Sequence, residues 1–71
     1  MAKRWDAGET GCGQLVVELR RRVEALEPGE HLEVVSHEPG AAIDLPAWCR
    51  MTGHRLISAD PPRYVIARRE A

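Results

Sequence analysis

Apolar residues between positions 14 and 26 recur at the spacing of one helical face. Their steps of four, four and three residues place them on the same side of an α-helix. The members of this row are Leu15, Leu19, Val23 and Leu26. Glu18 and Arg22 stand four apart, in the order that favours an ion pair on the solvent side. Pro28 and Gly29 end the pattern. The pattern predicts a helix over residues 14–26.

Shorter segments predict four β-strands. In His31–Ser36, Leu32 and Val34 alternate with polar residues, so one face of this strand can be buried. The other candidate strands are Lys3–Ala7, His54–Ala59 and Arg63–Arg68. Only Asp60-Pro61-Pro62 separates the last two segments. They are therefore expected to form an antiparallel hairpin.

A second helix is expected to begin at Ala41 or Asp44 and to end at Thr52. Asp44 is a residue type that caps helix N-termini, and Pro46 is tolerated in a first turn, where no amide donor is needed. Gly53 is a typical C-terminal stop. If Asp44 is the cap, Asp44→Ala should cost about 1 kcal/mol of stability.

The order β-α-β-α-β-β predicts an α/β (α+β) two-layer sandwich, with a four-stranded mixed sheet and both helices on one face. Leu19, Val23 and Trp48 are expected between the helices and the sheet. The opposite sheet face is left for solvent or a partner. We expect residues 1–71 to form a single domain.

Size and charge restrict the function. A chain of 71 residues buries only about 60% of its unfolded surface, which excludes a large enclosed active site. Ten basic against eleven acidic residues give a net charge of −1, which disfavours direct nucleic-acid binding through bulk charge. No apolar run approaches the length of a membrane span, and the N-terminus lacks the apolar core of a signal peptide. We therefore expect a cytoplasmic protein that does not bind membranes.

Cys12 is the sharpest chemical feature, because Gly11 and Gly13 flank it directly before the best-predicted helix. The positive end of a helix dipole and its free amides stabilise a thiolate, so the pKa of Cys12 is expected to be lowered. The neighbouring glycines carry no side chains and allow a reaction partner to approach closely. The alternative is an unreactive cysteine in a loop.

The other polar candidates have simpler explanations. Cys49 falls inside the second helix and is expected to be a packed thiol, with a resolving role toward Cys12 as the alternative. The three histidines are too scattered to predict a metal site; they are His31, His37 and His54. The run of residues 20–22 is all arginine, and we expect a solvated helix face balanced by Glu18 and Glu24, with docking of an acidic partner as the alternative.

The chain as a whole resembles the TusA (SirA-like) family of sulfur carriers. The most specific similarity is to an acidic-Pro pair, an Asp-Ile-Pro step, an aromatic-Cys pair and a Gly-His step. In this sequence these are Glu38-Pro39, Asp44-Leu45-Pro46, Trp48-Cys49 and Gly53-His54. The early part matches as well, with Cys12 six residues after Asp6.

The resemblance implies both the sandwich fold and sulfur carriage as a persulfide on Cys12, the expected catalytic residue. It implies a cysteine desulfurase or a rhodanese-like protein as sulfur donor. The implied acceptor is a protein of tRNA thiolation, molybdenum-cofactor assembly or sulfur oxidation. This sulfurtransferase-type chemistry requires no cofactor and no metal.

The sequence departs from the family at the thiol itself. The family motif Cys-Pro-x-Pro reads Cys12-Gly13-Gln14-Leu15 here. Proline at the start of a helix preorganises the turn, whereas glycine leaves it more mobile. We therefore predict a divergent subgroup in which Gly11, Gly13 and Gln14 present the thiol or bind a partner. Two alternatives are a non-catalytic interaction or regulatory module that keeps the fold, and a redox-responsive domain using Cys12 and Cys49.

Overall fold

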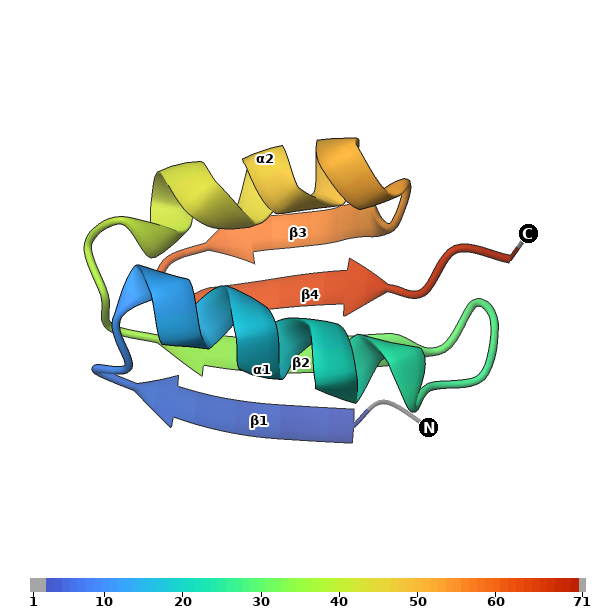
Figure 1. The fold of residues 1–71 in the computed structure, drawn as a ribbon, viewed down its shortest axis with the longest axis horizontal. Coiled ribbons are helices and arrows are strands. Elements are labelled where there is room, and N and C mark those ends of the chain that lie inside the picture. The colour runs from blue at the N-terminus through green and yellow to red at the C-terminus, as the bar shows by residue number, and fades with distance from the viewer. Residues whose placement is uncertain (1–2, 71) are drawn as a thin grey trace.

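The computed structural model describes residues 3–70 and contains four strands and two helices in the predicted order (Figure 1). The elements are β1 (Lys3–Gly8), α1 (Cys12–Glu24), β2 (His31–Ser36), α2 (Ala41–Thr52), β3 (Arg55–Asp60) and β4 (Arg63–Ala67). The strands form one sheet in the order β1-β2-β4-β3. This arrangement confirms the predicted fold class.

The sheet is mixed, as predicted. β1 runs parallel to β2, with Trp5 opposite Val34. β4 runs antiparallel to both of its neighbours, and the hairpin predicted around Pro61 and Pro62 joins it to β3. The two outer strands each contain one shift of register, between Asp6 and Gly8 in β1 and between Leu56 and Ser58 in β3.

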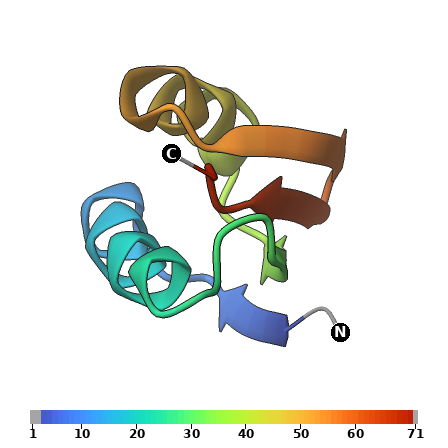
Figure 2. The same cartoon turned by 90° about the vertical axis from the view of Figure 1, so that its right-hand side faces the viewer.

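Both helices cover the same face of the sheet (Figure 2). The core lies in this interface, and the row of apolar residues predicted for the first helix is fully buried there. Leu19 and Val23 are 0% exposed and Trp48 is 7% exposed, which confirms the predicted placement of all three. Tyr64 and Ile66 supply the sheet side of the same core. Burying a large apolar side chain contributes about 1.5–3 kcal/mol, so this interface is the main source of stability.

Helix α1 begins two residues earlier than its apolar pattern predicted. Gly11 occupies the N-cap position with extended backbone (φ −66°, ψ 157°), and the Leu15 amide donates to the Gly11 carbonyl at 2.7 Å. The helix ends at Glu24, so Leu26 packs into the core from the following turn. Apolar spacing marks only the buried face of a helix, and the first buried residue of α1 is Leu15. This explains why the pattern did not extend back to Cys12 and Gly13.

Helix α2 begins at Ala41, and the prediction that Asp44 caps it is wrong. Gly40 is the N-cap, and the Asp44 amide already donates to the Gly40 carbonyl at 2.9 Å, inside the helix. The turn before the helix is closed instead by the Glu38 carboxylate, which accepts from the Gly40 amide at 3.1 Å. Pro46 lies in the second helical turn rather than the first. Asp44 therefore retains only its favourable interaction with the positive end of the helix dipole.

Gly53 ends α2 as predicted, and its replacement is expected to be costly. Its φ of 85° lies in the left-handed region, and its amide donates to the Cys49 carbonyl at 2.9 Å. An added Cβ would meet only the Arg69 side chain at 3.6 Å, so the cost of Gly53→Ala is conformational, about 1–2 kcal/mol. Urea denaturation should show this decrease in the free energy of unfolding.

Gly13→Ala is the matched control for Gly53→Ala, with the opposite expected sign. Gly13 lies within α1, and a Cβ there would meet none of the described atoms within 4 Å. Alanine in a helix is more stable than glycine by about 0.5–1 kcal/mol. An equal, neutral result for both variants would contradict the assignment of a left-handed cap to Gly53.

Candidate functional site

The predicted site residues Gly11, Cys12, Gly13 and Gln14 lie together at the start of α1, with Cys12 as its first residue. The first helical hydrogen bond comes from the Leu15 amide, so the three preceding amides have no acceptor within the helix. The first turn contains no acidic residue, and none of the described side chains caps the helix. This end of α1 therefore keeps the positive partial charge that stabilises an anion.

A shallow hollow lies beside this helix start, on the side of β1. It has a volume of about 370 Å³ and is lined by Trp5, Thr10, Gln14, Glu18 and Arg22. The Arg22 guanidinium lies over the Trp5 ring, 4.8 Å from its centroid, and its Nε lies 3.0 Å from a Glu18 oxygen. These exposed contacts are each worth about 0.5–1 kcal/mol or less. They hold the outer face of α1 against β1.

The arginine run is balanced by carboxylates, as predicted. Arg21 and Arg22 both contact Glu18, at 3.6 Å and 3.0 Å, and Arg20 contacts Glu24 at 3.1 Å. The side chains of Arg20 and Arg21 are largely exposed, and that of Arg22 is 43% exposed. The run is therefore a solvated helix face with paired charges.

A second and larger hollow, the interhelical groove, lies between α1 and α2 and has a volume of about 510 Å³. Its lining residues are Val16, Val17, Arg20, Glu24, Trp48, Met51, Thr52, His54 and Arg69. The sequence pattern did not predict this groove. The sequence feature that could have indicated the groove is the pair Val17 and Met51. These apolar residues lie outside the buried helical rows and are 62% and 83% exposed.

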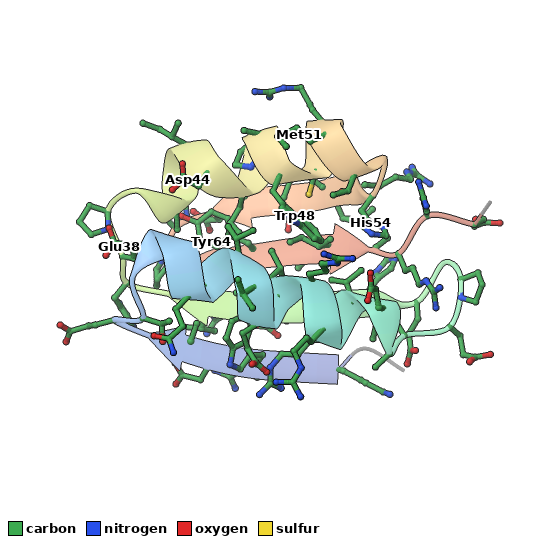
Figure 3. The ribbon with its side chains drawn as sticks, in the orientation of Figure 1. Glu38, Asp44, Trp48, Met51, His54 and Tyr64 are labelled. Atoms are coloured by element: carbon green, nitrogen blue, oxygen red, sulfur yellow. The ribbon has the colours of Figure 1, made fainter. Side chains whose placement is uncertain are left out.

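Trp48 and His54 stack on each other at the α2 side of the groove (Figure 3), with ring centroids 5.2 Å apart. The His54 Nδ1 accepts a hydrogen bond from the Arg69 amide at 3.0 Å. Burial is the first cause that lowers the pKa of His54, followed by Arg69 and Arg68, while Glu24 raises it. The imidazole is therefore neutral at pH 7, with its proton on Nε2.

Cys49 is a core thiol, as expected. It is 4% exposed, and burial raises its pKa from 9.0 to about 11. Such a thiol is almost entirely protonated at neutral pH and is a poor nucleophile. This environment does not favour a resolving role toward Cys12.

Two further findings concern the described part of the chain. Among the described side chains of residues 3–11 and 13–70, no three histidine, cysteine or acidic groups lie together so that they could hold a metal ion. Neither helix within the same range has the length and apolar character that crossing a bilayer requires.

Comparison with known protein families identifies the family to which the chain is similar over most of its length. A family model that matches residues 3–67 places this protein in the class of small sulfur carriers that act in sulfur relay. That model is described as Sulfurtransferase TusA, and the chain belongs to this family. The resemblance found in the sequence is thereby confirmed.

Proposed function

We propose that this protein carries sulfur as a persulfide on Cys12 and relays it between proteins. The observation that carries the proposal is the position of Cys12, the first residue of α1 in a chain of the TusA family. A thiol at a helix N-terminus is favoured as thiolate, which is the nucleophilic form of cysteine.

The proposed reaction needs only this thiolate and two partner proteins. The Cys12 thiolate attacks the outer sulfur of a persulfide on the donor. The S–S bond of the donor breaks, its cysteine leaves as a thiolate, and a new S–S bond forms on Cys12. An acceptor thiolate then attacks the outer sulfur of the Cys12 persulfide and regenerates the Cys12 thiolate. Sulfur is transferred without a net change in oxidation state, so no cofactor is consumed.

The neighbours of Cys12 have proposed roles in presenting the thiol. Gly11 and Gly13 leave the space beside the helix start open, since an added Cβ at either residue would meet none of the described atoms within 4 Å. Gln14 is exposed on the same turn. Residues 1–71 would act as one domain, in the cytoplasm. The proposed donor is a cysteine desulfurase or a rhodanese-like protein, and the acceptor belongs to tRNA thiolation, molybdenum-cofactor assembly or sulfur oxidation.

Intact-protein mass spectrometry tests the proposal directly. After incubation with a cysteine desulfurase and cysteine, the wild-type protein should gain the mass of one or more sulfur atoms. Treatment with a reductant should remove this mass, because it reduces the persulfide. Cys12→Ser should show no gain, since the accepting thiol is absent.

Cys49→Ser is the control for this experiment and should gain sulfur like the wild type. If the wild-type protein gains no mass from the desulfurase and none from a rhodanese-type donor, sulfur carriage is excluded. The family fold would then serve a non-catalytic interaction module, and loss of the motif prolines at Gly13 and Leu15 would mark the loss of the chemistry.

A further inference from the structure

The interhelical groove has an apolar rim that residues 3–70 leave uncovered. Val17 on α1 and Met51 on α2 line the groove from its two helices and are 62% and 83% exposed. Trp48, only 7% exposed, lines the same groove (Figure 3). Single exposed apolar residues are common on protein surfaces. Here two of them border one groove with an aromatic ring, which is the composition of an anchor pocket for an apolar side chain.

The charges around this groove favour an acidic partner. Two arginines, Arg20 and Arg69, line it together with one acidic residue, Glu24. Glu24 pairs with Arg20 at 3.1 Å, whereas Arg69 donates through one Nη to the uncharged carbonyl of Thr52 at 3.0 Å. The charge of Arg69 is not neutralised by that contact, and its guanidinium has further donors.

The charged groups around His54 also indicate that the electrostatic field in the groove is positive. Arg69 and Arg68 both oppose protonation of this groove residue, and Glu24 alone is the acidic group that favours it. The groove therefore presents net positive charge close to its apolar rim. A carboxylate placed there would gain favourable electrostatic energy.

The groove also begins close to the candidate thiol position. Cys12, Val16, Arg20 and Glu24 follow each other at intervals of four residues, so they form one row along α1. The last three line the groove. One such step advances about 6 Å along a helix. A segment lying in the groove would therefore end about one turn from position 12.

We propose that the interhelical groove docks an acidic segment of a partner protein. An apolar side chain of this segment lies between Val17 and Met51, and its carboxylates lie beside Arg20 and Arg69. The part of this inference that concerns sulfur, namely that docking brings the partner's sulfur-bearing residue to Cys12, rests on the proposed function. The binding itself does not require a reactive Cys12.

Fluorescence titration tests the docking site with a defined probe. The probe is a short peptide in which two leucines are flanked by glutamates. In a Trp5→Phe background Trp48 is the remaining tryptophan and reports directly on the groove. The peptide should change the Trp48 emission saturably, and the binding should weaken as salt concentration rises. Peptides with lysine for glutamate, or serine for leucine, should not bind.

Two matched variants locate the site. Met51→Glu removes the apolar rim and adds repulsion, so it should raise the dissociation constant at least about tenfold. Ile43→Glu makes the same change on α2 at a residue that is 75% exposed but is not among the groove residues, and it should have no effect. No binding of the acidic peptide, equal binding of the lysine peptide, or equal loss in both variants would overturn the proposal. The titration is repeated with Cys12→Ser, so a failure of persulfide formation does not alter its outcome.

Discussion

At pH 8 the native protein is expected to react with iodoacetamide at one thiol, Cys12, and to leave Cys49 unmodified. Burial raises the pKa of Cys49 to about 11, so about one molecule in a thousand carries its thiolate at this pH, against about a quarter for an ordinary thiol. Cys49 is also 4% exposed, so the reagent reaches it only when α2 opens. Together these effects should make Cys49 more than about a hundredfold slower than Cys12.

Peptide mapping of the alkylated protein measures this difference. Cys12→Ser should lose the fast reaction, and Cys49→Ala should keep it. In denaturant both thiols should react at similar rates, because unfolding removes the burial that raises the pKa of Cys49. Raising the pH toward 11 should increase labelling of native Cys49, since its thiolate fraction rises about tenfold per pH unit below its pKa. Fast labelling of Cys49 at pH 8 would contradict its placement in the core.

Leu19→Ala is expected to be among the most damaging single substitutions for stability. Leu19 is 0% exposed in the middle of α1 and belongs to the core between helices and sheet. Truncating a fully buried leucine to alanine costs about 2–5 kcal/mol, because apolar burial is lost and a cavity is left. Domains of this size have a total stability of only a few kcal/mol to about 10 kcal/mol. The variant should therefore lose a large part of its free energy of unfolding.

Thermal and urea denaturation of two companion variants separate packing from helix propensity. Val17→Ala removes an apolar side chain from the same helix at a site that is 62% exposed, and it should change stability by less than about 0.5 kcal/mol. Leu19→Met keeps the buried volume and should cost less than about 1.5 kcal/mol. Equal stability of Leu19→Ala and Val17→Ala would show that the face of α1 has been assigned wrongly.

The periodic parts of the fold were predictable from the sequence. Helix α1 has three buried apolar residues at steps of four, a fourth, Leu26, follows from the next turn, and His31–Ser36 has the bounds expected for β2. The prediction that Gly53 ends α2 was correct because few residues other than glycine adopt a left-handed cap. The start of α2 was not predictable in the same way. Its N-cap is Gly40, supported by a contact from the Glu38 side chain, and the better capping residue type, Asp44, lies inside the helix.

The candidate site also has one part that depends on neighbouring residues in the sequence and one part that depends on tertiary packing. The position of Cys12 at the start of α1 was predictable because its surroundings, a glycine on each side and a following helix, are local in sequence. The interhelical groove was not, because it combines α1 with α2 and with Arg69 from the end of the chain. The stack of Trp48 on His54 and the hydrogen bond from the Arg69 amide depend on how these segments pack. No spacing rule in the sequence encodes such contacts.

The irregularities in the two outer strands have a consequence for the behaviour of the protein at high concentration. β1 and β3 lie at the free edges of the sheet, and each contains one of the two register shifts. A bulged and twisted edge does not offer the regular row of backbone groups that a strand of another molecule would need for pairing. We therefore expect the edge strands of different molecules not to pair with each other. Concentrated solutions should resist the edge-to-edge growth that leads to fibrils.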